Sequence, residues 1–176
     1  WDGFVESEVF DVAMLFRRID ACVIDGVAED VPRLQRAGLA TYGASPLHMG
    51  LLGSKYDEFV RERPAWVGPG PIARALRLRA LAEKHGLPLA TLAHRFLFSV
   101  AEIDRVVLGA CTPAELTGAL ADFSAGPFLF SPLSNRLDHG TSPMVPSPKA
   151  YDRWAASLPL SGAGRPSGTT VALRAS

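Results

Sequence analysis

The chain has 176 residues, of which 48% are hydrophobic, and its 18 basic side chains balance 18 acidic ones. This length is typical of one domain, and the balanced charge argues against a nucleic-acid or anionic-membrane partner. Two isolated cysteines, Cys22 and Cys111, argue against a disulfide scaffold or a zinc site and favour a cytoplasmic location. We see no apolar run of membrane-spanning length and no signal peptide.

The first part of the chain predicts two strands separated by a helical stretch. Residues 9–16 form a β-rich apolar run that predicts a buried strand. Residues 22–37 carry apolar side chains at helix-like spacing, and the helix has an alternative start at Pro32 with Asp30 as its cap. Residues 39–44 then predict a second strand.

Segments of possible ligand contact follow both predicted strands. Arg17 and Arg18 come directly after the first strand and are either a solvated strand exit or a contact for an anionic ligand. Residues 45–53 form a turn-rich loop whose small side chains would let a ligand approach the backbone. Residues 54–70 predict a long loop or lid with one short helical turn, and long loops are often functional.

Two helices and a polar extension are indicated further along the chain. Residues 71–85 and 89–100 have the apolar spacing of helices, with a proline at the start of the first. His94 lies within the second helix, where a histidine is more often structural than a ligand. Residues 1–123 therefore form the predicted domain, and the Pro-, Ser- and Gly-rich residues 124–176 predict a partly disordered extension.

A third strand leads directly into a capped helix. The apolar run within residues 105–108 predicts a strand covered on both faces. Thr112 and Glu115 form a capping box at the start of the helix predicted at residues 113–123. The positive end of this helix and its free N–H groups suit a phosphate, but capping boxes are common and an ordinary capped turn is the more frequent explanation of such a pattern.

The alternation of strands and helices predicts an α/β fold with a parallel sheet of right-handed βα units. A closed (β/α)₈ barrel needs eight strands and at least ~200 residues, more than this chain supplies. We therefore expect either a small open sheet or a piece of a larger fold.

Four segments in a fixed order make the sequence look familiar: residues 44–52 (ASPLHMGLL), 82–86 (AEKHG), 92–97 (LAHRFL) and 107–116 (VLGACTPAEL). Together they resemble the C-terminal part of aldo-keto reductases, with the aldose or L-galactose dehydrogenase branch the most similar. The resemblance implies the C-terminal portion of a (β/α)₈ TIM barrel, about three βα units with an irregular tail. The three predicted strands would then be the last three of that barrel.

The resemblance also implies an NADP or NAD cofactor, held by the loops after the second and third strands. The matched cofactor-binding positions are Ser45, Leu47, Gly50 and Leu51 in the first loop and Gly109, Ala110, Cys111, Thr112 and Glu115 in the second. The first loop would contact the cofactor diphosphate. The second would meet the adenosine phosphate, with Glu115 near the adenine ribose.

The implied reaction is hydride transfer between NAD(P)(H) and an aldehyde or sugar-type carbonyl or hydroxyl. The family's Asp, Tyr, Lys and His tetrad comes from the first half of the barrel, which this chain does not contain. We therefore assign no catalytic residue and no metal site, and expect no activity from this chain alone. A possible N-terminal half-barrel in cis would supply the tetrad, and His48 either touches the substrate or is an ordinary loop residue.

Some positions depart from the family pattern. Gly118 and Ala119 stand where Glu and Asn usually read adenine, and Ala44 replaces an aromatic that often stacks on nicotinamide. The turn at residues 109–112 has no Arg or Lys for a 2′-phosphate, so NAD and NADP both stay open. One alternative is a catalytically dead half-barrel remnant that binds a nucleotide or a protein. Another is an unrelated small α/β binding protein.

Overall fold

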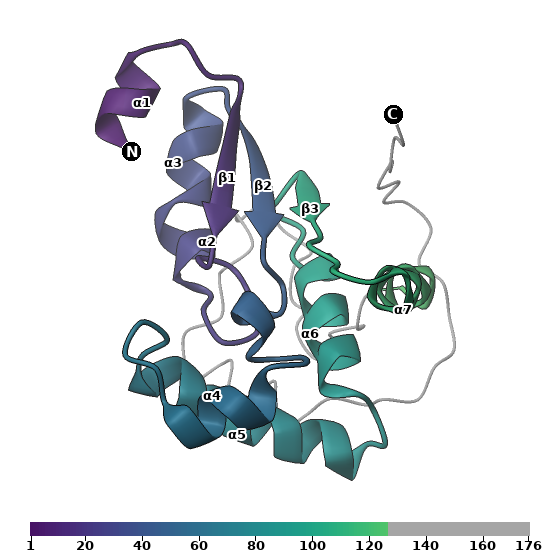
Figure 1. The fold of residues 1–176 in the computed structure, drawn as a ribbon. Coiled ribbons are helices and arrows are strands. Elements are labelled where there is room, and N and C mark those ends of the chain that lie inside the picture. Colours follow the sequence, from purple (N-terminus) through teal and green to yellow (C-terminus); the bar gives the residue numbers. More distant parts are fainter. Residues whose placement is uncertain (127–176) are drawn as a thin grey trace, which may run out of the picture.

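The computed structural model describes residues 1–126, so nearly all of the predicted extension at 124–176 lies outside the described residues. Three parallel strands form the sheet: β1 (Val12–Phe16), β2 (Ala40–Ala44) and β3 (Arg105–Val107), in the order β1-β2-β3 (Figure 1). The predicted α/β class and the parallel sheet are confirmed. Because the three strands are parallel, the loops that follow them leave the sheet at one edge.

Seven helices and one 3₁₀ turn accompany the sheet among residues 1–126. They are α1 (Asp2–Glu6), α2 (Asp25–Glu29), α3 (Val31–Arg36), η1 (His48–Gly50), α4 (Tyr56–Glu62), α5 (Pro69–Lys84), α6 (Leu89–Phe98) and α7 (Pro113–Ser124). The sequence predicts one short helical turn within residues 54–70, and the structure has the seven-residue helix α4 there. Helix α5 begins two residues earlier than predicted, because Gly68 at its N-cap adopts a positive φ of 83° that redirects the chain.

The helical stretch expected at residues 22–37 is divided into α2 and α3. Asp30 stands at the start of α3, but its side chain does not cap that helix. Its carboxylate instead accepts hydrogen bonds from Arg18 Nε at 2.7 Å and from the indole N–H of Trp1 at 3.0 Å. The capping expectation for Asp30 is therefore wrong, because contacts with distant segments compete for the same oxygen atoms.

The buried strand predicted at residues 9–16 is confirmed in part: β1 is shorter, and only one of its faces is buried. Ala13 and Leu15 are buried in a core to which α2, α3 and α6 contribute. Val12, Met14 and Phe16 alternate with them and are 42%, 51% and 52% exposed. Their face of the sheet therefore presents apolar side chains that no described residue covers.

The third strand is short and only half-buried, so the expected burial on both faces is wrong. Arg105 is exposed and Val106 and Val107 are intermediate, and within residues 1–126 β3 is an edge strand that pairs with β2 alone. Asp104 fixes its start: the carboxylate accepts from the N–H of Thr41 at 2.7 Å and from its hydroxyl at 3.0 Å.

A second core positions the loop after β2. Leu51 and Leu52 in this loop are fully buried among side chains of α4, α5 and α6. Figure 1 shows α4 and α5 lying beneath the carboxyl end of the sheet, with α6 between α5 and β3. No helix within residues 1–126 is both long and apolar enough to cross a bilayer.

Candidate functional site

The two predicted cofactor loops begin side by side. Ala44, the last residue of β2, pairs in register with Val107, the last residue of β3. Ser45 and Leu108 therefore leave neighbouring strands at the same level. Ser45 is half-buried, whereas the turn at residues 109–112 is exposed. The structure thus brings together the starts of the two segments that the sequence predicts.

The loop after β2 has an unusual backbone. Ser45, His48 and Met49 have positive φ values of 65°, 47° and 59°, although none is a glycine. This conformation costs an L-residue on the order of 1–2 kcal/mol, so surrounding contacts must hold the loop in place. Two of those contacts are local: Ser45 Oγ accepts from Met49 N–H at 3.1 Å, and Ser45 C=O accepts from His48 N–H at 3.0 Å.

A buried carboxylate–imidazole pair provides a third contact. His48 Nδ1 lies 2.8 Å from Asp20 Oδ2, and the two side chains are 1% and 0% exposed. The other oxygen, Asp20 Oδ1, accepts from the backbone N–H of Cys22 at 2.6 Å and of Val23 at 3.0 Å. The sequence draws attention to His48 through its loop position, but no local pattern identifies Asp20 as its partner.

The remaining predicted residues of this loop differ in accessibility. Leu47 and Gly50 are half-buried, but the side chain of Leu51 is fully enclosed in the core. Any contact of Leu51 with a ligand would therefore come from its backbone. Gly50 has a φ of 97°, and a Cβ there would lie 2.9 Å from Lys55 Cγ, so a larger residue would strain the turn.

The predicted capping box at the start of α7 is formed in part. Thr112 Oγ1 accepts from the N–H of Glu115 at 3.2 Å, which confirms the N-cap. The Glu115 carboxylate, however, accepts from the N–H of Cys111 at 2.7 Å and not from that of Thr112. The small, exposed turn with Gly109 and Ala110 fits a phosphate, but Glu115 places a negative charge there that competes for one donor.

Arg17 and Arg18 are both held by other parts of the chain. Arg17 Nη2 donates to the carbonyl of Trp66 at 3.0 Å, and its guanidinium lies 5.3 Å from the centre of that indole ring. Arg18 pairs with Glu29 at 2.6 Å and with Asp30 at 2.7 Å. The hydrogen bond to Asp30 raises the pKa of Arg18, with a further contribution from Glu29. These contacts favour a structural role for the two side chains.

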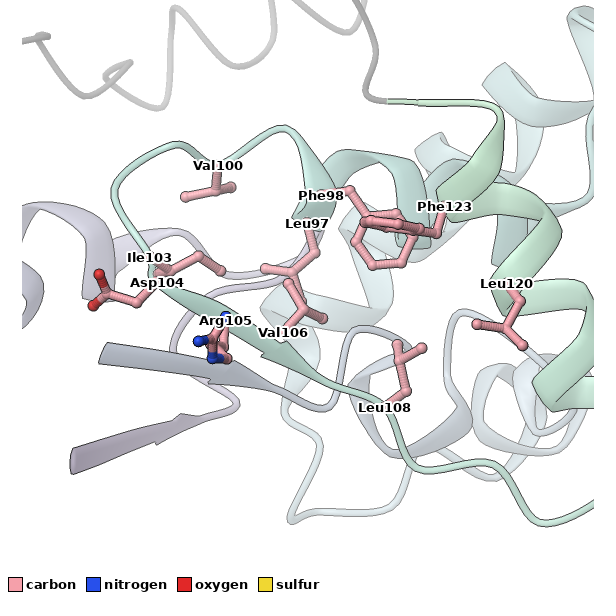
Figure 2. A pocket seen from close by; sticks show the side chains of 10 residues that line it. All are labelled: Leu97, Phe98, Val100, Ile103, Asp104, Arg105, Val106, Leu108, Leu120 and Phe123. Atoms are coloured by element: carbon pink, nitrogen blue, oxygen red, sulfur yellow. The ribbon is translucent and has the colours of Figure 1, made fainter. Parts of the chain in front are cut away.

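His94 also has a structural partner, as expected. Its Nδ1 lies 2.8 Å from Asp122 Oδ2, which joins α6 to α7. Near this pair, an apolar cavity of about 60 Å³ lies between β3, α6 and α7. Figure 2 shows Leu108 and Leu120 facing each other across it, with the rings of Phe98 and Phe123 together above them in this view.

Neither this cavity nor a second one described below has the size of a ligand site. A second cavity, of about 210 Å³, lies at the start of α5 between Pro64 and Leu76. Ligand pockets usually enclose about 300–1,000 Å³. Neither of these two cavities is therefore large enough to enclose a dinucleotide.

Comparison with known proteins gives one clear result. The family model described as the Aldo/keto reductase family matches residues 25–128, which is more than half of the chain. The match includes β2, β3 and every predicted cofactor position, whereas β1 and Asp20 precede it. A search of the curated proteins found no match. The match removes the interpretation of an unrelated α/β binding protein.

Proposed function

Because the chain belongs to the aldo/keto reductase family, we propose that it supplies the cofactor-binding part of an NAD(P)(H)-dependent oxidoreductase. The substrate class is an aldehyde or a sugar-type carbonyl or hydroxyl. The observation that supports this proposal is the placement of both candidate loops at one edge of the sheet, next to the N-terminus of α7. When bound, the nicotinamide cofactor supplies or accepts the hydride.

The proposed roles of this chain's residues are in binding. The loop containing Ser45, Leu47, Gly50 and Leu51 would hold the diphosphate through its backbone and the Ser45 hydroxyl. The turn at residues 109–112 would meet the adenosine phosphate at the positive end of α7. Glu115 would lie near the adenine ribose, where a carboxylate accepts from a 2′-hydroxyl and repels a 2′-phosphate. We assign no proton-transfer step to any residue of the chain.

The proposal includes strands supplied from elsewhere, in cis or as a separate half-barrel. The exposed apolar side chains of Val12, Met14 and Phe16 support it, since such a face is normally covered. Within residues 1–126, β1 and β3 each pair with one neighbour, so their outer edges are available to further strands. Such strands would close a (β/α)₈ barrel and bring the catalytic Asp, Tyr, Lys and His.

Dinucleotide binding tests the proposal directly. The full chain labelled with ¹⁵N is titrated with NAD⁺, NADP⁺ and, as a control, adenosine. We expect the two dinucleotides, but not adenosine, to shift the amide signals of residues 45–51 and 109–115 together. Shifts in neither loop would overturn the cofactor assignment.

A matched pair of variants sharpens this test. A Cβ at Gly109 meets no atom within 4 Å, so Gly109→Asp adds a carboxylate to the phosphate turn without a clash. Ala101→Asp adds the same charge in an exposed turn before β3, at the opposite edge of the sheet. Two like charges about 5 Å apart in water repel by ~1 kcal/mol, so Gly109→Asp should weaken dinucleotide binding about fivefold. Ala101→Asp should leave the affinity unchanged.

The exposed apolar face also favours a second candidate, a catalytically dead remnant that binds a protein partner. The mass of the endogenous polypeptide and the turnover of NADPH with an aldose separate the two. A product much larger than 18.8 kDa that oxidises NADPH supports the reductase. A product of about this mass, without turnover or dinucleotide binding, supports the binding module.

A further inference from the structure

We propose that Asp20 and His48 are positioning residues that hold the strained loop after β2 in its ligand-binding conformation. His48 then has its ring proton on Nδ1. The ligand-binding part of this inference rests on the proposed function, because the loop is the one assigned to the cofactor diphosphate. The holding part concerns the chain by itself and can be tested without any cofactor.

Asp20 is a rigid anchor. Both of its carboxylate oxygens are engaged, Oδ1 by the N–H groups of Cys22 and Val23 and Oδ2 by His48. Its backbone is fixed as well: Asp20 N–H donates to Val23 C=O at 2.6 Å, and Val23 N–H donates back at 3.1 Å. Because the carboxylate is fully buried and fixed through Oδ1 and the backbone, it can set the position of His48, which binds Oδ2.

His48 is the part of the loop that needs such an anchor. It and Met49 are consecutive residues in the left-handed region, where non-glycine residues are disfavoured. Leu51 and Leu52 fix the far end of the loop in the core, and β2 fixes its beginning. The bond to Asp20 ties the strained middle of the loop to the segment after β1, 28 residues earlier.

The pairing also determines which nitrogen carries the proton. An ionised carboxylate can only accept, so His48 Nδ1 must be the donor. In the neutral ring Nε2 is then an acceptor, and it is buried with no hydrogen-bond partner among the described residues. Burying an acceptor such as Nε2 without a partner costs free energy. The ring can occupy this position because the hydrogen bond to Asp20 offsets that cost.

Imidazole ¹⁵N spectra of the full chain test the proton assignment. We expect His48 to carry its proton on Nδ1 in the wild-type chain. In Asp20→Asn the amide N–H₂ can donate to Nδ1, so the proton should move to Nε2. A wild-type ring protonated on Nε2 alone would overturn the proposal.

Amide hydrogen exchange of residues 45–53 tests the holding role. His48→Leu removes the donor, and exchange in the loop should accelerate at least tenfold, as expected for losing a bond to a charged group. Asn tolerates positive φ and can donate from its side-chain N–H₂, so His48→Asn should keep exchange within threefold of wild type. Unchanged exchange in His48→Leu would refute the holding role.

A second carboxylate–imidazole pair provides the matched control. His94 and Asp122 have the same 2.8 Å separation but join α6 to α7. His94→Leu makes the same chemical change as His48→Leu and should leave exchange at residues 45–53 unaltered. Equal acceleration in both variants would mean general loosening of the fold and would overturn the proposal.

Dinucleotide affinity completes the test. His48→Leu should weaken the binding of NAD⁺ or NADP⁺ about tenfold, and His48→Asn should restore it to within threefold. Faster loop exchange with unchanged affinity would refute the positioning role. If the wild-type chain binds neither dinucleotide, the proposed function fails, and the tautomer and exchange results still decide whether the pair holds the loop.

Discussion

The contact between β2 and the segment leading into β3 leaves no room for a side chain at Gly43. A Cβ at this position would lie 2.7 Å from Ile103 Cδ1 and 3.4 Å from Leu97 Cδ1. Both neighbours are buried, at 9% and 0% exposure, so neither can swing into solvent. Gly43→Ala therefore forces Ile103 to move by several tenths of an ångström within the core.

The expected cost follows from this geometry. Overpacking a core by one methyl group costs typically about 1–3 kcal/mol. Replacing Gly by Ala within a strand returns roughly 0.5–1 kcal/mol. We therefore expect Gly43→Ala to lower the free energy of unfolding by about 1–2 kcal/mol.

A second substitution isolates the contact. Ile103→Val removes Cδ1, the atom that the new Cβ would meet, at a cost of about 0.5–1.5 kcal/mol by itself. In the double variant the methyl group introduced by Gly43→Ala occupies the space that Cδ1 leaves. The two effects should then fall short of additivity by about 1 kcal/mol or more.

Urea unfolding of the full chain, followed by far-UV circular dichroism, measures all three variants. Unfolding free energies that add within about 0.3 kcal/mol would refute the reasoning, because independent sites behave in that way. A stabilised Gly43→Ala would refute it as well, since it would mean that the sheet and the segment before β3 lie farther apart than the structure has them.

Three further predictions concern stability. Gly118→Ala should stabilise α7 by about 0.5–1 kcal/mol, because the new Cβ meets nothing within 4 Å. Thr112→Ala should destabilise the same helix by ~1 kcal/mol, because it removes the N-cap. Thermal unfolding that ranks the two variants in the opposite order would contradict this. Burial, with a smaller contribution from Asp20, raises the pKa of the Cys22 thiol. The unfolded thiol ionises near pH 8.5, so above that pH the unfolded state binds fewer protons and stability falls, by up to about 1.4 kcal/mol per pH unit. In urea unfolding between pH 8 and 10, the stability of Cys22→Ser should therefore fall less steeply with pH than that of the wild type. Identical slopes of stability against pH would exclude a contribution from Cys22. Asp104→Ala should lower the free energy of unfolding by about 2–3 kcal/mol, because it leaves the buried N–H and hydroxyl of Thr41 without their acceptor. Asp104→Asn keeps an acceptor oxygen and should recover part of that free energy. Urea unfolding that ranks the two variants the other way would contradict this.

The sequence by itself determined the features that depend on neighbours along the chain. The apolar runs located all three strands, and the N-cap at Thr112 marked the start of α7. The segment around Ser45 and the turn at Gly109 were found by family resemblance. The match over residues 25–128 supports that resemblance, and the cofactor contacts themselves stay predictions.

Only the tertiary structure decided which faces are covered and which polar groups meet. The apolar run of β1 could not reveal that Met14 and Phe16 lie on an uncovered face, because burial depends on what other segments supply. The Asp30 carboxylate binds Arg18 and the indole of Trp1 and does not cap its own helix. This happens because a carboxylate binds the best donor in reach, whether or not that donor is near in sequence.

The pairing of Asp20 with His48 is the clearest example of a contact that the sequence could not predict. The two residues are 28 positions apart in segments of different character, and no spacing rule relates them. The parallel register of β1 and β2 brings the ends of both strands to one edge, and only there can the carboxylate reach the imidazole. The chain encodes the strands locally, but the contact between Asp20 and His48 exists only once the sheet has formed.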